Sequence, residues 1–175
     1  MRELRGTGVS AGIAIGPVKV LEEARQVVHR TVDDVRAEIE RFRQAQQVSM
    51  DQLAKLREDT ATRLGEDKAE LFDTHRLMLK DPDYVEGVEG LIQSDKVNAE
   101  YAVDTTTQRF AAMFAGMDSP YMQARAADVQ DVSRRLIDNL GSGAQAGGAD
   151  RPTIVMAVDL APSQTAQMDP TQVLG

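Results

Sequence analysis

Few residues in this chain are of types that could do chemistry. It has two histidines, His29 and His75, and no cysteine. The lack of cysteine excludes disulfides, thiolate metal sites and cysteine nucleophiles. Neither histidine has another histidine at the helical i+4 position, so we predict no metal site. His75 stands at an apolar position of its predicted helix, which favours a partly buried core histidine.

A loose dinucleotide-binding pattern, GxGxxG/A, is present at residues 6–11 (GTGVSA). A true nucleotide site needs a strand before this pattern and a helix after it. Here there is no room for a preceding strand, and a strand period follows. We therefore interpret the pattern as a glycine-rich approach to a sheet and predict no nucleotide site.

The charge of the chain limits the partners that it can bind. The net charge is −8 and the sequence pI is near 4.8. Nucleic acids and anionic membranes bind basic surfaces, so we expect neither as a partner. No apolar run approaches the roughly 20 residues of a membrane span, and residues 1–5 lead into no apolar signal segment. The cytoplasm is the simplest predicted location.

Nearly all of the net charge lies in one stretch of the chain. Between Gly65 and Asp104, eleven acidic and four basic residues leave a net charge of −7. A pair of solvated helices would give the same composition. The functional alternative is an acidic surface that attracts a basic protein partner.

The elements that must position these residues follow from the hydrophobic period. Residues 13–20, with a turn at Gly16-Pro17, and residues 153–158 have the period of strands. Two strands are too few for an independent sheet. We predict that both belong to one α/β domain, which the segment between them interrupts and which is incomplete at Gly175.

From Thr31 onward, apolar residues recur at steps of three and four, which predicts helices. Thr31-x-x-Asp34 resembles a capping box for a long first helix that Gly65 ends, and Gly141 ends the last helix. The later helices are expected to begin at Asp81-Pro82, Asn98 and Ser119-Pro120. Short connections between helices predict an antiparallel bundle.

The predicted fold class is therefore α+β, with a helical bundle inserted in an incomplete α/β domain. We expect the first strands of the α/β domain in residues 1–24 and the helical domain in residues 25–143. A flexible glycine-rich linker and the continuation of the α/β domain follow in residues 144–175.

Four motifs run in order along the whole chain. They are GVSAGIAIG at 8–16, GEDKAELF at 65–72 with His75 and Met78-Leu79 after it, RAADVQDV at 125–132, and DLAPSQTA at 159–166. Together they resemble enzyme I of the bacterial phosphoenolpyruvate–sugar phosphotransferase system. The third motif is similar to the family almost residue for residue, whereas Ala161 replaces a threonine in the fourth.

The resemblance implies a helical HPr-binding domain inserted in an α/β phosphohistidine (swivelling) domain. In that family, a histidine in a Gly-Gly-x-Thr-Ser-His motif takes phosphate from phosphoenolpyruvate and passes it to HPr, a small phosphocarrier. The motif is absent from these 175 residues, so we expect the chain alone to be inactive and monomeric. Mg²⁺ with phosphoenolpyruvate, and homodimerisation, are implied for the full-length family through a C-terminal domain.

The resemblance also implies roles for individual residues. The positions that match the HPr-binding surface are Glu66, Asp67, His75, Met78, Asp81 and Arg125. Lys68 and Thr165 match residues that hydrogen-bond and orient the phosphohistidine. A basic carrier would be attracted by the acidic stretch. Acidic residues at the start of a helix are also favoured by the helix dipole, which is the alternative for Glu66 and Asp67.

Two other functions stay open at this point. The same module occurs in nitrogen-related enzyme I paralogues and in proteins of dihydroxyacetone phosphorylation. A helical module that binds proteins without phosphotransfer is the second alternative.

Overall fold

The computed structural model describes residues 12–21, 27–141, 151–158, 160–169 and 171–174. The glycine pattern at 6–11 and the glycine-rich linker at 142–150 lie outside the described residues. The predicted domain boundaries, near residues 24 and 143, also fall there and stay predictions.

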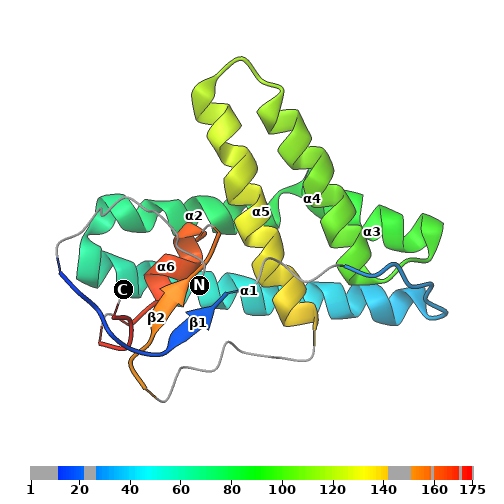
Figure 1. Cartoon of the computed structure of the whole chain (residues 1–175). Coiled ribbons are helices and arrows are strands. Elements are labelled where there is room, and N and C mark those ends of the chain that lie inside the picture. The colour runs from blue at the N-terminus through cyan, green and yellow to red at the C-terminus, as the bar shows by residue number, and fades with distance from the viewer. Residues whose placement is uncertain (1–11, 22–26, 142–150, 159, 170, 175) are drawn as a thin grey trace.

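The described residues form a helical bundle and a small parallel sheet (Figure 1). The helices are α1 (Val35–Leu64), α2 (Glu66–Lys80), α3 (Pro82–Asp95), α4 (Ala99–Ala115), α5 (Pro120–Leu140) and α6 (Pro162–Gln167). The strands are β1 (Val18–Val20) and β2 (Ile154–Met156). α2 and α3 return end to end along α1, and α4 and α5 form a second hairpin that crosses this layer (Figure 1). The predicted α+β class with a helical bundle is confirmed.

The boundaries of α1 depend on one side-chain cap and one glycine. The Asp34 carboxylate accepts a hydrogen bond from the Ala37 amide at 2.9 Å, so Asp34 is the N-cap. The predicted cap at Thr31 is wrong, because Thr31 pairs with Val97 in a short antiparallel bridge. Gly65 ends α1 as predicted, at a φ of 93° that favours glycine.

Helices α3, α4 and α5 begin where the sequence predicts, but only α3 has the predicted side-chain cap. The Asp81 carboxylate accepts a hydrogen bond from the Tyr84 amide at 3.1 Å. Neither Asn98 nor Ser119 caps its helix with its side chain. The Asn98 side-chain oxygen instead accepts a hydrogen bond from the Arg30 amide at 2.8 Å. This bond attaches the segment before α1 to the connection between α3 and α4.

The core of the bundle is aliphatic with a few aromatic rings. Its largest fully buried apolar side chains are Phe42, Leu53, Phe72, Leu79, Ile92 and Leu136. They come from α1, α2, α3 and α5, and each contributes about 1.5–3 kcal/mol by burial. α4 contributes mainly small residues, such as Ala99 and Ala102, which let neighbouring helices approach closely.

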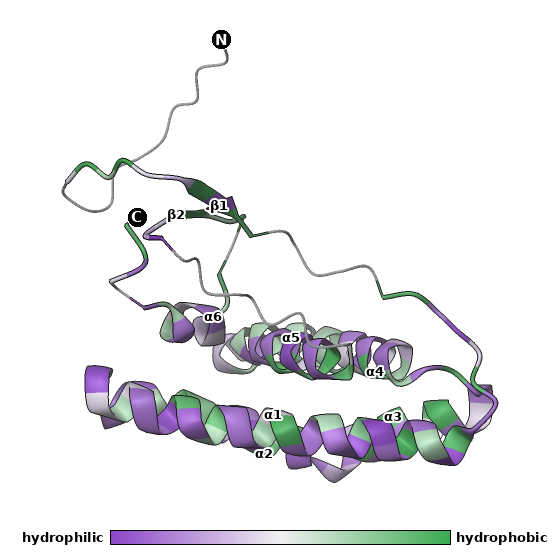
Figure 2. Cartoon of the chain, turned by 90° about the horizontal axis from the view of Figure 1, so that it is seen from below, coloured by the Kyte–Doolittle hydropathy of each residue, from purple (hydrophilic) through white to green (hydrophobic). Residues whose placement is uncertain are grey.

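The two strands pair segments that are far apart in the sequence. β1 and β2 are parallel, with Val18 opposite Ile154. This pairing is what a helical insertion between two strands of one sheet requires. Figure 2 shows both strands as mainly hydrophobic segments set apart from the helical layers. Of the two strands predicted on either side of Gly16-Pro17, only the second forms, since Ile13 and Ile15 are exposed and lie outside β1.

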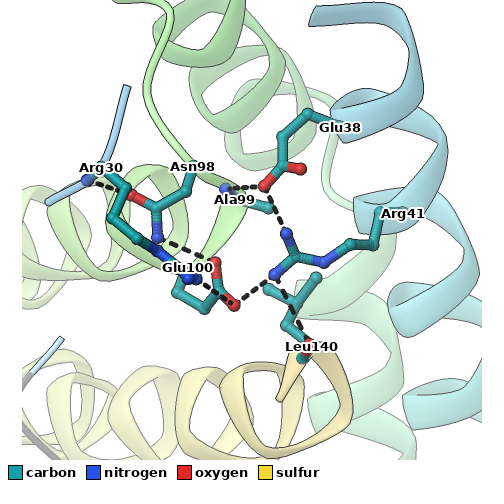
Figure 3. Close-up of polar contacts among 7 residues, drawn as sticks. All are labelled: Arg30, Glu38, Arg41, Asn98, Ala99, Glu100 and Leu140. Atoms are coloured by element: carbon teal, nitrogen blue, oxygen red, sulfur yellow. Dashed lines mark hydrogen bonds and ion pairs between the residues drawn. The ribbon is translucent and has the colours of Figure 1, made fainter. Parts of the chain in front are cut away.

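A buried ionic cluster joins the starts of α1 and α4 to the end of α5 (Figure 3). Arg41 Nη1 donates to Glu38 Oε1 at 2.7 Å, and Nη2 contacts Glu100 and, at 3.4 Å, the Leu140 carbonyl. The nearly buried Glu38 also accepts a hydrogen bond from the Ala99 amide at 2.6 Å. One guanidinium therefore neutralises carboxylates from two helices.

Arg41→Met should lower the free energy of unfolding by about 2 kcal/mol, because the nearly buried Glu38 would lose its cation and Glu100 would keep only the more exposed Arg30, at 3.5 Å. Arg36→Met is the matched control on the same helix, since Arg36 is exposed and makes no ion pair with the residues that the structure describes. We expect almost no change for this control. Urea denaturation followed by circular dichroism measures both variants, and equal losses would contradict an anchoring role for the cluster.

Candidate partner-docking surface

Most of the predicted partner-binding residues lie on α2, which is amphipathic. Its buried face contains Ala69, Phe72, His75 and Leu79. Residues spaced by four, three and four share the opposite face. This face, here named the α2 stripe, consists of Glu66, Glu70, Asp73 and Leu77. The Leu77 side chain is 69% exposed, which is unusual for a leucine in a helical bundle.

Arginines of α1 neutralise part of the acidic stretch. Arg57 Nη2 donates to Glu66 at 2.6 Å, and its Nε donates to Asp73 at 3.2 Å. Two further acids, on α3 and α4, also pair with arginines of α1. The net charge of −7 is therefore not one continuous patch. Acidic side chains that remain exposed on α2 and at the start of α3 are Glu66, Asp67, Glu70, Asp81, Asp83 and Glu86.

His75 is fully buried, with 0% of its side chain exposed. This burial corrects the prediction that His75 contacts a partner directly, because no part of its imidazole ring is accessible from the surface. Its Nε2 lies 3.5 Å from Asp128 Oδ1 on α5, and its ring meets Phe72 edge-on. At 3.5 Å this contact is electrostatic rather than a well-formed hydrogen bond. The structure supports the interpretation that the helical period favoured, a core histidine.

Arg125 of α5 is fixed beside His75 through the same carboxylate. Its Nη1 donates to Asp128 Oδ2 at 2.7 Å, and its guanidinium carbon lies 4.5 Å from the centre of the Tyr121 ring. Burial raises the pKa of the Asp128 carboxyl, but His75 and Arg125 outweigh burial and hold that pKa below its usual range. Asp128 is therefore ionised and joins α2 to Arg125.

Tyr121 and Asp128 were not among the predicted partner-binding residues. Tyr121 is 66% exposed and stacks on Arg125, as arginine and aromatic rings do at protein interfaces. The sequence contained a signal for both, because they stand four residues before and three residues after Arg125. These spacings place side chains together on a helix.

Met78 and Asp81 lie at the junction of α2 and α3. Met78 is half-buried and Asp81 is exposed. Both line a small apolar cavity of about 50 Å³, whose other lining residues are Tyr84, Phe110, Phe114, Val129 and Val132. Burial raises the pKa of Tyr84 to about 12, although hydrogen bonds with Thr107 and Ser133 oppose this shift. The Tyr84 hydroxyl therefore stays neutral.

The predicted docking residues form two groups along α2. Glu66 and Asp67 begin the helix. Glu66 is nine residues before His75, which corresponds to about 13 Å along the helix axis. Met78 and Asp81 lie at the other end, and α5 places Arg125 next to the second half of α2 through Asp128. All except His75 have an exposed or half-buried side chain.

The residues predicted to orient a phosphohistidine lie on different elements. Lys68 is exposed on α2, seven residues before His75, and thus on the helix side that faces α5. Thr165 is exposed on α6, and its hydroxyl donates to the Ala161 carbonyl at 3.2 Å. Among the described residues no hydrogen bond joins Lys68 to Thr165. Their joint role stays a prediction.

Two kinds of feature are absent from the described part of the chain. No group of three or more His, Cys, Asp or Glu residues there is arranged to hold a metal ion. No helix there combines the length and the apolarity needed to cross a bilayer.

Comparison with known families identifies this arrangement. A family model described as PEP-utilising enzyme, N-terminal, matches residues 5–125. The chain belongs to this family. It is 42% identical over 177 residues to a phosphoenolpyruvate-protein phosphotransferase of Listeria monocytogenes, and 40% identical over 179 residues to one of Bacillus subtilis. These alignments cover 99% and 100% of the chain but 31% of each relative, so the chain spans about a third of their length.

Solved structures agree with this assignment. The chain is similar to a solution structure of an Enzyme I protein, with a TM-score of 0.77 and 32% identity over 94% of this chain and 68% of the other. It also has the fold of the N-terminal domain of a nitrogen Enzyme 1, with a TM-score of 0.74 and 22% identity over 91% and 67%. The resemblance to enzyme I that the motifs predicted is confirmed.

Asp128→Asn should lower the free energy of unfolding by about 1–2 kcal/mol at pH 7, because it removes the charge that faces Arg125. The folded-state pKa of Asp128 is lowered, so this stabilisation is present above the unfolded value of about 4 and is lost as the pH falls through the folded value. The gap between the variant and the unmodified chain should therefore close in acid.

Urea denaturation at several pH values from 7 to 3 measures this gap. Asp95→Asn, at the exposed end of α3, controls for the general effect of removing one carboxylate. A gap that is as wide at pH 3 as at pH 7 would exclude a charge effect at Asp128.

Proposed function

We propose that this chain is the carrier-docking part of a phosphoenolpyruvate–protein phosphotransferase. Its helical bundle binds a small basic phosphocarrier of the HPr type. Its α/β part is proposed to present a phosphohistidine that lies further along the longer polypeptide. The relatives of Listeria monocytogenes and Bacillus subtilis, both named phosphoenolpyruvate-protein phosphotransferases, support this proposal.

The observation on which the proposal depends is the combination of exposed charges and large side chains on α2 and α5. Met78 of α2 is half-buried where α2 meets α5, and Arg125 lies beside α2 with the exposed Tyr121 against it. Interfaces depend on a few large anchors of this kind, above all aromatic residues and arginine. Acidic residues around such anchors supply the attraction for a basic partner.

The proposed reaction is a transfer of a phosphoryl group between two histidines. The P–N bond to the donor imidazole breaks while a P–N bond to an imidazole nitrogen of the carrier forms. The proton that the acceptor ring loses is balanced by protonation of the donor ring. Lys68 and Thr165 are proposed to hydrogen-bond the donor histidine and orient it. In-line transfer depends mostly on such positioning.

Other properties belong to the longer protein and are part of the same proposal. Mg²⁺ with phosphoenolpyruvate is proposed to act in a separate C-terminal part, and no step is assigned to it here. Homodimerisation through that part and a cytoplasmic location are also proposed. The chain of 175 residues is proposed to be an inactive monomer that keeps its docking surface.

The carrier that the chain binds distinguishes the sugar pathway from the nitrogen-related pathway. One structural neighbour is titled as the N-terminal domain of a nitrogen Enzyme 1, but at 22% identity it supports the fold alone. We therefore propose the sugar pathway, and titration with carriers of both pathways tests it. Binding without any phosphorylation of the longer polypeptide by phosphoenolpyruvate would instead support a non-catalytic interaction module.

Reversing the charge of Glu66 and Asp67 to lysine should slow association with an HPr-type carrier about 3–10-fold at low salt, because electrostatic steering acts on the association rate. The effect should shrink as salt screens the field. Stopped-flow association rates at several salt concentrations measure it. Titration of isotope-labelled carrier should also shift resonances around its active histidine.

The double variant Asp33→Lys/Asp95→Lys is the matched control. It changes the net charge by the same amount, but Asp33 precedes α1 whereas Glu66 follows it, so the change lies at the other end of that helix. An equal slowing by both double variants would show that only net charge matters. Carrier shifts scattered away from its histidine would argue against docking.

Tyr121→Ala and Met78→Ala should each weaken carrier binding about 10-fold, mostly through faster dissociation, because each shortens a large side chain where α5 meets α2. Val48→Ala is the control, since Val48 is an exposed aliphatic residue in the middle of α1. Isothermal titration calorimetry gives the affinities. Unchanged binding in both variants would show that the region where α2 and α5 meet is not part of the interface.

A further inference from the structure

A buried carboxylate on α5 attaches the α/β part to the helical bundle. Asp131 is only 4% exposed. Its Oδ1 accepts a hydrogen bond from the Ser163 hydroxyl at 2.6 Å, and its Oδ2 accepts one from the Ser163 amide at 3.1 Å. A buried charge is unfavourable unless hydrogen bonds satisfy it. Both oxygens of Asp131 are satisfied only while α6 lies on α5.

At the start of α6 the Gln164 side chain accepts a hydrogen bond from the Ala161 amide at 2.9 Å, but no side chain of α6 accepts one from the Ser163 amide. The N-cap residue is Ala161, whose methyl group cannot accept a hydrogen bond, although its φ of −64° and ψ of 150° are those of a cap. Pro162 follows and has no amide hydrogen. The Ser163 amide is thus the first donor that needs an acceptor, and Asp131 supplies it from another helix. The same hydrogen bond therefore caps α6 and attaches it to the bundle.

The other polar contacts of α6 with the bundle are less buried. Arg134 Nη1 donates to Gln164 Oε1 at 3.1 Å, and Arg63 Nη1 donates to the Ala166 carbonyl at 3.3 Å. Arginine side chains are long and adapt to small displacements of their acceptors. A short buried aspartate that makes two hydrogen bonds to one residue fixes position more tightly.

The same face of α5 also contacts the docking helix. Asp128 and Asp131 are three residues apart and lie on neighbouring turns. Asp128 faces His75 of α2, whereas Asp131 holds Ser163 of α6, the helix that contains Thr165. α5 therefore links the docking surface rigidly to the element that is proposed to orient the phosphohistidine.

We propose that Asp131 is a positioning residue for phosphoryl transfer: through Ser163 it holds α6, and with it Thr165, at a fixed place relative to the carrier on α2. This inference rests on the proposed function for the role of Thr165 and of the carrier. Transfer requires the two histidines in line, and a displacement of about 1 Å can slow such a reaction about 100-fold. Asp131 touches neither histidine and acts through α6.

The attachment itself can be measured in this chain alone. The chain has no cysteine, so Lys55→Cys gives a single site for a spin label, and Lys55 lines the groove between α1, α5 and α6. Asp131→Asn should weaken the paramagnetic broadening of α6 amides and speed the hydrogen exchange of the Ser163 amide at least 10-fold. Unchanged broadening and exchange would overturn the proposal.

A second substitution separates capping from attachment. Ala161→Ser in the Asp131→Asn background gives α6 an N-cap of its own but no bond to α5. We expect slower exchange in α6 than in the single variant, with the broadening from the label still reduced. Full recovery of the broadening would show that Asp131 only caps the helix, and would overturn the proposal.

The consequence for transfer is tested in the chain extended through its phosphohistidine segment. Asp131→Asn should lower kcat for transfer to the carrier at least 10-fold and leave KM for the carrier within 2-fold, because the docking surface is unchanged. A raised KM with an unchanged kcat would overturn the positioning role. If the unmodified chain binds no carrier, the proposed function fails while the results for α6 still stand, so the two failures are distinguishable.

Discussion

Charged side chains buried between helices fix how the parts of this chain lie relative to one another. Arg41 neutralises two carboxylates where α1, α4 and α5 meet. Asp128 joins α5 to α2, and Asp131 joins α5 to α6. An apolar contact tolerates some sliding, whereas a buried carboxylate is satisfied in few geometries. α5 takes part in all three contacts, so the arrangement of the other elements depends on it.

The helices were predictable because their limits are encoded locally. Gly65 and Asp81-Pro82 act through their own backbone and side-chain chemistry, and the structure uses both as predicted. The start of α1 was not predictable in this way. Two residues that can cap stand three positions apart, and the choice of Asp34 follows from the pairing of Thr31 with Val97, which is distant in the sequence.

The candidate site was predictable where one helix contains all the members of a contact. Arg125 was identified by its motif, and the spacing along α5 would also have found its neighbours Tyr121 and Asp128. Contacts between helices were not predictable. The acidic stretch loses part of its charge to Arg57 of α1, which no local pattern specifies. The helical period favoured a buried His75, but it did not indicate the contact of His75 with Asp128 on α5.

The α/β part depends on the bundle more than on its own packing. Val18 and Val20 of β1 and Met156 of β2 are exposed, so this two-stranded sheet buries little apolar surface. Apart from Ala166, which packs against the core, the contacts described between α6 and the bundle are polar. Water can replace hydrogen bonds at a small net cost, whereas separating apolar surfaces exposes them. The α/β part is therefore held on the bundle mainly by hydrogen bonds between α6 and helices α5 and α1.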